Sequence, residues 1–298
     1  RARRKYRYDL AMLQDPAEAM PPSNKRALKL FVEAGKELGI EVDPVGREDF
    51  ARLAEYDGLF IRETTALDHH TYRFAHRAER EDMVVIDDPT SILRCTNKVY
   101  LAELLKANKV PTPKTVVVNA MKSLEELEGE LPYPMVLKIP DGAFSRGVHK
   151  VGDRAELKKM TRDLLEESDL ILAQEFMPTD YDWRVGVLDG EPLFVCQYLM
   201  AKKHWQIVKH NADGPATHGG FKSFAVEQAP AEVVEVAVKA ARLIGNGLYG
   251  VDLKQNERGV FVIEINDNPN LDTGVEDAAL KDELWKRLVR WFLKRLEA

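Results

Sequence analysis

The feature that most constrains the fold is the alternation, over residues 8–90, of short apolar runs with amphipathic helical patterns. Parallel strands need crossover connections, which are usually helices, so this alternation predicts a parallel or mixed sheet with helices packed on it. The runs that predict strands are residues 8–13, 40–45, 58–61 and 83–86. After Pro21-Pro22-Ser23, apolar residues recur at helical spacing until Gly39, which predicts a helix that ends there. The first third of the chain is therefore predicted to be a small α/β domain.

The remainder of the chain predicts two further units that mix helices and strands. A helix over about 97–108 closes the first unit, and the Pro-rich segment 110–113 predicts a linker. Residues 114–176 then predict strand, helix, strand, glycine-bearing loop, helix and strand. Further strands are predicted at 184–188, 192–199, 248–254 and 260–266, and helices at about 230–245 and 277–297. The last helix carries apolar residues on one face, which indicates core packing and no site.

Charge, hydropathy and cysteine content exclude several classes of partner. The formal net charge is −6 and no long basic block is present, so nucleic acid is not an expected partner. No run reaches the ~20 apolar residues of a membrane span, so no membrane partner is expected either. Cys95 and Cys196 are too few for a disulfide framework or a thiolate metal site. We expect a cytoplasmic protein, and the start at Arg1 without Met leaves open a further domain before it.

The strongest chemical signal is a predicted hairpin near the C-terminal end of the chain. Asp252 lies in its first strand, Glu264 and Asn266 lie in its second, and the turn spans residues 256–259. Because side chains alternate along a strand, Glu264 and Asn266 face the same side, and the turn brings Asp252 within about one register step of Glu264. Hard oxygen ligands suit Mg²⁺, so a metal site is predicted here. A salt bridge or edge-strand polarity is the alternative.

Two lysines are candidates for binding phosphate. Lys138 alternates with Leu137 and Ile139 along a strand, and it leads into the loop 141–147, whose amides and Ser145 can cover phosphates. Lys98 lies in the first turn of a helix, which we expect Thr96 to cap. A cation there is unfavourable with the helix dipole, but a bound anion such as phosphate would interact favourably with both. An ordinary strand connection and an exposed lysine are the alternatives.

Further polar residues follow the predicted strands on either side of Pro178. The apolar strand 172–177 ends in a polar pair, at an edge that can offer backbone groups to adenine. Asp182 and Arg184 lie on one strand face, and Arg184 can hold phosphate oxygens bidentately. A basic loop is predicted between the later strands, and it indicates either substrate binding or a solvated surface. It consists of the segments 201–204 and 209–211, followed by His218-Gly219-Gly220.

Two other patterns are set aside. Residues 245–250 match the dinucleotide-binding pattern G-x-G-x-x-G, but a helix precedes them and a strand follows, so a helix-to-strand turn is predicted. The pair His69-His70 lacks a second spaced set of ligands, so no metal site is predicted there. No P-loop, HExxH or G-x-S-x-G motif is present.

In chain order, these motifs resemble the ATP-grasp superfamily, and more narrowly its RimK-like glutamate ligase branch, related to the glutathione synthetase type. The resemblance covers nearly the whole chain. It implies an α/β and α+β fold in which a Rossmann-like pre-ATP-grasp domain, residues 1–108, precedes a two-subdomain ATP-grasp fold. The lid subdomain would span 109–177, and the C-terminal subdomain with the metal site would span 178–298.

The resemblance implies a role for each matching residue. Those implied to bind ATP are Lys98, Lys138, Ser145, Arg146, Gly147, Gln174, Glu175, Phe176, Met177, Asp182, Lys209 and Asn211. Those implied to hold two Mg²⁺ ions, with Mn²⁺ as an alternative, are Asp252, Glu264 and Asn266. Arg184 would steady the transferring phosphoryl group, while Lys202 and Arg62 would orient an acidic substrate. The residues of the basic loop differ from those usual in the branch, so the resemblance does not identify the substrates.

The implied activity is ATP-dependent ligation of a carboxylate to an amine through an acyl phosphate, with glutamate or another acidic amino acid as one substrate. The partners would be a small-molecule acid and amine, or a peptide or protein tail as acceptor, and a homo-oligomer is compatible with the branch. A small-molecule kinase on the same scaffold and a non-catalytic ATP-binding module are the alternatives.

Overall fold

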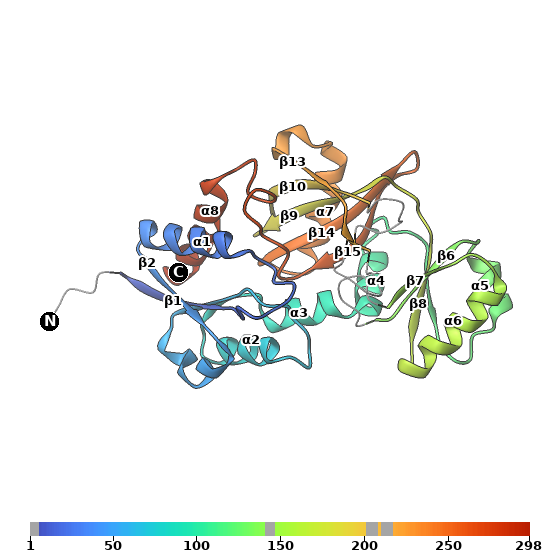
Figure 1. Ribbon diagram of the computed structural model, residues 1–298, viewed down its shortest axis with the longest axis horizontal. Coiled ribbons are helices and arrows are strands. Elements are labelled where there is room, and N and C mark those ends of the chain that lie inside the picture. The colour runs from blue at the N-terminus through green and yellow to red at the C-terminus, as the bar shows by residue number, and fades with distance from the viewer. Residues whose placement is uncertain (1–5, 141–146, 201–207, 210–216) are drawn as a thin grey trace.

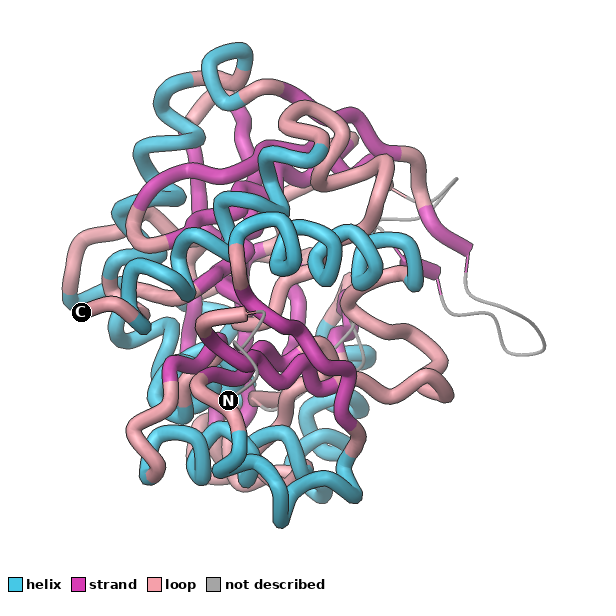
Figure 2. The backbone as a smooth tube through the Cα atoms, turned by 90° about the vertical axis from the view of Figure 1, so that its left-hand side faces the viewer, coloured by secondary structure: helices cyan, strands magenta, loops and turns pink. Residues whose placement is uncertain are grey.

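The structure is a computed structural model, and it describes residues 6–140, 147–200, 208–209 and 217–298. Its strands form three main sheets, and Figure 1 shows them as separate parts of the molecule, the first in blue, the second in green and the third in yellow to red. The view in Figure 2 shows helices on the outside of the sheets. The mixed α/β and α+β class predicted from the sequence is confirmed.

The first sheet is entirely parallel, in the order β2-β1-β3-β4. Its strands are β1 (Tyr8–Leu13), β2 (Ile40–Val45), β3 (Gly58–Ile61) and β4 (Val84–Ile86). The connecting and following helices are α1 (Lys25–Leu38), η1 (Arg47–Glu55), α2 (His70–Arg80) and α3 (Pro89–Thr96). The predicted strands are therefore present, with the fourth starting one residue later than expected. All four strands end at the edge of the sheet that carries residues 14–23 and 62–69.

Helix α1 shows how local sequence sets the ends of these elements. The Asn24 side chain accepts a hydrogen bond from the amide of Ala27 and caps the helix. At the other end Gly39 adopts φ 88°, a left-handed conformation that glycine adopts without a steric penalty. Between these ends Ala27, Phe31 and Ala34 are buried against the sheet.

The second sheet is antiparallel, in the order β5-β8-β6-β7, and follows α4 (Lys98–Ala107). Its elements are β5 (Thr115–Val118), α5 (Leu124–Glu130), β6 (Met135–Lys138), β7 (Val148–Val151), α6 (Arg154–Glu167) and β8 (Ile171–Glu175). Strand β7 was not predicted, because only its two terminal valines are apolar and the two residues between them are polar. It pairs with β6 across the 141–147 loop.

The third sheet is antiparallel, in the order β13-β10-β9-β14-β15, with α7 packed against it. Its strands are β9 (Tyr181–Leu188), β10 (Glu191–Leu199), β13 (Phe221–Phe224), β14 (Leu248–Asn256) and β15 (Gly259–Asn266). The short strands β11 (Val208–Lys209) and β12 (Thr217–His218) pair with each other, η2 (Val226–Gln228) follows β13, and α7 spans Ala231–Arg242. Strands β14 and β15 form the predicted hairpin. Of residues 245–250, the predicted helix-to-strand turn, the last three already belong to β14.

The last helix, α8 (Asp282–Leu296), returns to the first sheet. Figure 1 shows it beside α1, and the ring of Phe292 lies 6.4 Å from that of Phe31 and 5.8 Å from that of Phe60. The prediction that it starts at residue 277 was wrong, because the Asp277 carboxylate accepts hydrogen bonds from the amide of Gly274 and the indole of Trp285 and holds the preceding turn. The first sheet and the end of the chain thus share one core.

In the part of the chain that the structure describes, no helix combines the length and the apolar content that crossing a membrane requires.

Candidate active site

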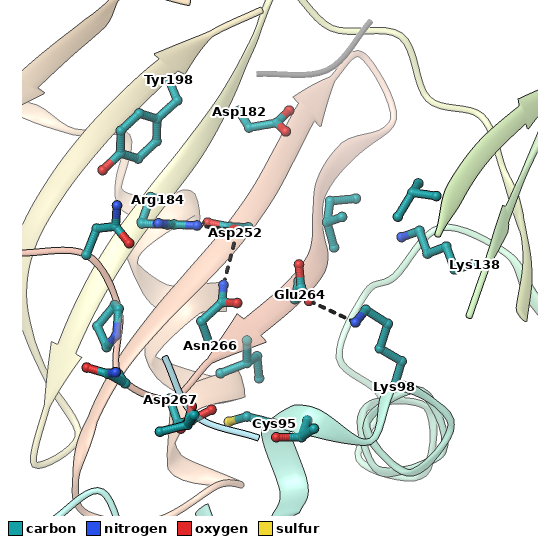
Figure 3. Close-up of a pocket in the computed structure, with 18 of the residues that line it drawn as sticks. Cys95, Lys98, Lys138, Asp182, Arg184, Tyr198, Asp252, Glu264, Asn266 and Asp267 are labelled. Carbon is teal, nitrogen blue, oxygen red and sulfur yellow. Dashed lines mark hydrogen bonds and ion pairs between the residues drawn. The ribbon is translucent and has the colours of Figure 1, made fainter. Parts of the chain in front are cut away.

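One cavity of about 650 Å³ lies where the three sheets meet, a volume typical of small-molecule sites. Segments 19–22 and 64–66 line it from the first sheet. It is also lined by these residues predicted for the site: Lys98, Lys138, Gln174, Glu175, Phe176, Met177, Asp182, Arg184, Asp252, Glu264 and Asn266. Residues more than 160 positions apart in the chain therefore border one space (Figure 3).

The three predicted metal ligands lie together on the β14–β15 hairpin. Asp252 pairs in register with Glu264, and Asn266 Nδ2 lies 3.2 Å from Asp252 Oδ2. Burial raises the pKa of Asp252 although a guanidinium lies beside it, and the Glu264 carboxylate adds to the rise. Negative charge concentrated in a buried cavity favours a cation, and carboxylate and amide oxygens are the donors that Mg²⁺ accepts. The donor set therefore fits a magnesium site.

Arg184 lies on β9 directly opposite Asp252 on β14. Its Nε and one terminal nitrogen donate to the two oxygens of Asp252 at 2.6 and 2.7 Å, a bidentate pair drawn in Figure 3. The guanidinium also lies 5.2 Å from the ring centroid of Tyr198 on β10. A planar, permanently charged fork of this kind suits phosphoryl oxygens.

Two ammonium groups lie on the other side of the cavity, near the carboxylate of Glu264. Lys98 Nζ lies 3.5 Å from Glu264 Oε1 (Figure 3). Lys138 Nζ donates to Gln174 Oε1 at 2.7 Å. Burial lowers the pKa of Lys138 to about 8, and the nearby charges of Lys98 and Lys254 act in the same direction while Glu264 opposes them. The helix cap beside Lys98 is Asn97, not Thr96 as expected, because the Asn97 side chain accepts from the amide of Tyr100.

The strand predicted to contact adenine has several side chains already in contact with protein. Gln174 Nε2 donates to Thr115 Oγ1 at 2.8 Å, which fixes the amide that receives Lys138. Glu175 accepts from the amide of Lys114 and forms an ion pair with Arg258, each at 3.1 Å. The ring of Phe176 lies under Lys150 Nζ, 3.9 Å from the ring centroid. These contacts position the edge of β8 at the cavity.

Asp182 has a partner that sequence reasoning missed. Lys254 Nζ donates to Asp182 Oδ1 at 2.6 Å and to Thr179 Oγ1 at 2.7 Å, and it lines the cavity. Lys254 lies two residues after Asp252 on one strand, so alternation could have placed both side chains on one face. Tyr198 and Asp267 also line the cavity and were missed, and of these two only Asp267, directly after Asn266, had a signal in sequence.

Some predicted site residues are not among those that the structure places at the cavity. Ser145, Arg146, Lys202 and Asn211 are outside the described residues, as is the side chain of Lys209. Gly147 is described, and its carbonyl accepts from the amide of Ile139 at 3.1 Å, but it does not border the cavity.

Arg62 has a setting that the sequence did not predict. It is buried, lies behind the cavity wall and does not line the cavity. Its guanidinium donates to the hydroxyl of Ser23, the side chain of Asn268 and the carbonyls of Pro22 and Pro269. Because described protein groups accept these hydrogen bonds, Arg62 is positioned to hold the residues around it, and the structure does not place it in the cavity to orient a substrate as expected.

Comparison with known proteins agrees with this geometry. Residues 95–292 match the family described as the RimK-like ATP-grasp domain. The alpha-aminoadipate–LysW ligase LysX of Saccharolobus solfataricus is 27% identical over 260 residues, which cover 81% of this chain and 88% of that protein. A probable alpha-L-glutamate ligase of Marinomonas sp. is 25% identical over 268 residues, which cover 85% of this chain and 86% of that protein.

A solved structure shows the same fold at low sequence identity. The D-alanine–D-alanine ligase of Bacillus anthracis in complex with ATP superposes with a TM-score of 0.70 at 15% identity, over 98% of this chain and 99% of that one.

Proposed function

Because the chain belongs to the RimK-like ATP-grasp family and is an ATP-dependent ligase, we propose that it activates the carboxylate of an acidic amino acid, or of a peptide that carries one, and joins it to an amine. The observation that carries the proposal is the meeting of three cationic side chains with three oxygen ligands in one cavity: Lys98, Lys138 and Arg184 face Asp252, Glu264 and Asn266. The names of two relatives, which refer to aminoadipate and glutamate, support an acidic substrate.

Each group has a defined task in this proposal. Lys98 and Lys138 bind the phosphates of ATP, and Gln174 orients Lys138 toward them. Asp252, Glu264 and Asn266 would hold Mg²⁺, whose positive charge lowers the barrier to phosphoryl transfer. Arg184 is held in line by Asp252 and contacts the oxygens of the transferring phosphoryl group.

The proposed reaction has two steps, and the walls of the cavity protect the intermediate between them. The substrate carboxylate takes the phosphoryl group and becomes an acyl phosphate, ADP leaves, and the amine attacks the acyl carbon with loss of phosphate. The walls formed by β6, β8 and segments 64–66 enclose the cavity and limit attack by water. No protein nucleophile is required, because the substrate carboxylate is itself the nucleophile in the first step.

ADP release in the presence of ATP and Mg²⁺ tests the proposal. The protein is supplied with pairs drawn from acidic amino acids, other amino acids and peptides ending in glutamate, and positive mixtures are analysed by mass spectrometry. We expect ADP together with a product lighter by one water than its two substrates combined. ADP with a phosphorylated product and no amine requirement would identify a kinase instead, and ATP binding without turnover would identify a binding module.

A matched pair of variants connects the activity to the site. Glu264→Gln removes one charge from the metal ligands, whereas Glu257→Gln makes the same change at the exposed turn of the same hairpin. The proposal requires that only the first variant loses ADP release.

A further inference from the structure

A second group of metal-ligating side chains lies at the start of α2, outside the lining of the active-site cavity. Glu63 follows β3 by two residues, His69 is the N-cap residue of α2, and His70 is its first residue. One ligand atom from each of the three lies within 4.8 Å of the others. The two histidines alone predicted no metal site, because their third partner comes from the carboxyl end of a neighbouring strand and has no regular spacing in sequence.

Two buried carboxylates here each have one oxygen without a donor among the described residues. Glu63 Oε2 lies 2.5 Å from His70 Nε2, but no described group donates to the buried Glu63 Oε1, and the Glu63 side chain is only 3% exposed. Glu18 nearby accepts from the amide and the hydroxyl of Thr64 through one oxygen, while its other oxygen is buried and has no partner within the described part of the chain. A buried carboxylate oxygen without a donor is costly, and a cation removes that cost.

The two histidine rings lie close enough to share one ion. The two rings lie side by side, with centroids 3.9 Å apart. His69 Nδ1 lies 3.0 Å from Thr71 Oγ1, the kind of outer contact that orients a ligating ring.

We propose that Glu63, His69 and His70 bind one divalent transition-metal ion of the zinc type, with water completing its coordination. Two imidazoles and one carboxylate favour such an ion over Mg²⁺. Ligand atoms bound at about 2.0–2.2 Å to one ion lie at most about 4.4 Å apart, so small side-chain rotations close the observed arrangement around it.

The position of this site suggests what the ion does. Residues 64–66, which line the active-site cavity, connect Glu63 to the helix that carries the histidines. An ion held at both ends of this segment fixes the wall that the first sheet contributes to the cavity. The site therefore acts on the shape of the substrate region without contacting the phosphate-binding lysines.

Equilibrium dialysis against Zn²⁺ tests the proposal, with millimolar Mg²⁺ present to occupy the hairpin carboxylates and bound metal measured by mass spectrometry. We expect one tightly bound zinc per chain in the unaltered protein and at least tenfold weaker binding in Glu63→Gln and in His69→Ala. His76→Ala removes an exposed histidine from the same helix and is the matched control, and Glu264→Gln alters only the active site. Both should keep the zinc.

Two further readouts make the result decisive. Co²⁺ in place of Zn²⁺ should give visible absorption bands that the His69→Ala protein lacks, and Zn²⁺ should raise the melting temperature of the unaltered protein but not of this variant. Because His69 is partly exposed, the variant tests the site even if Glu63→Gln fails to fold. Absence of tight zinc binding, equal binding by all variants, or loss of zinc in Glu264→Gln would overturn the proposal. The first of these outcomes would leave Glu63 and His70 as a pair that shares a proton.

Discussion

Replacement of Arg62 by methionine should destabilise the protein strongly, although this side chain does not line the active-site cavity. The guanidinium makes five hydrogen bonds to four acceptor groups, and the side chains of Ser23 and Asn268 among them are themselves buried. Burial lowers the pKa of Arg62 to about 10, so it remains charged at neutral pH. Methionine fills similar space without donating, so the Ser23 hydroxyl, the Asn268 side chain and the Pro269 carbonyl lose their donor, while the carbonyl of Pro22 still accepts from the amide of Leu271.

The size of the effect follows from these contacts. At about 1 kcal/mol for each of the three buried acceptors that lose their donor, the free energy of unfolding falls by about 3 kcal/mol. This agrees with the ~3–5 kcal/mol typical of breaking a buried charged network. Because Pro22, Asn268 and Pro269 also line the cavity, the KM for the amino-acid substrate should rise as well.

Urea unfolding at pH 7, followed by fluorescence and by circular dichroism, measures the change in stability. Arg26→Met, an exposed position on α1, is the control and should change the free energy of unfolding by less than ~0.5 kcal/mol. If Arg62→Met unfolds at the same urea concentration as the control, the buried network does not hold the first sheet to the segment after β15.

Three further predictions concern the cavity. Glu264→Gln should abolish ADP formation in a coupled assay, and retained turnover with an ordinary magnesium dependence would refute the metal assignment. Arg184→Lys cannot reproduce the bidentate pair with Asp252, so kcat should fall roughly 10²–10³-fold with little change in the KM for ATP, and an unchanged kcat would remove Arg184 from the reaction. Burial lowers the pKa of Lys138 to about 8, so its charge is present below that pH and lost above it; calorimetry should show ATP binding weakening as pH rises through about 8. In the protein without ATP, the same shift makes the free energy of unfolding increase as the pH rises from about 8 to 10.5. Over this range Lys138 is protonated in the unfolded chain but has lost its proton in the folded one. Lys138→Arg should keep ATP binding constant over this range, and a flat pH profile in the unaltered protein would contradict the assignment.

Features encoded over a few residues were predictable from sequence. The strands of the first sheet, the β14–β15 hairpin and the one-sided pattern of α1 follow from periodicities of two and 3.6 residues, which act locally. Strand β7 was missed because its pattern is too short and too polar to be distinguished from a loop. The start of α8 was misplaced because the carboxylate of Asp277 bonds backbone and side-chain groups of the turn, a contact that helical periodicity does not reveal.

The site was predictable where its residues share an element and unpredictable where they meet only in space. Asp252, Glu264 and Asn266 lie on one hairpin, so spacing alone placed them together. The setting of Arg62 depends on contacts with Asn268 and Pro269, which are more than 200 positions away in the chain. The resemblance to the family and the positive charge identified Arg62 as a candidate, but only tertiary packing determines whether its donors face a substrate or the protein.

The packing of α8 against α1 has a consequence for how the chain is made. The strands of the first sheet are complete once residue 86 has left the ribosome, but the helix that covers this part of the core begins at residue 282. At ordinary rates of synthesis the interval is on the order of 10–40 s. Throughout that time Phe31 and Phe60 lack the aromatic ring of Phe292, and the nascent first domain presents an uncovered apolar face to the cell's chaperones.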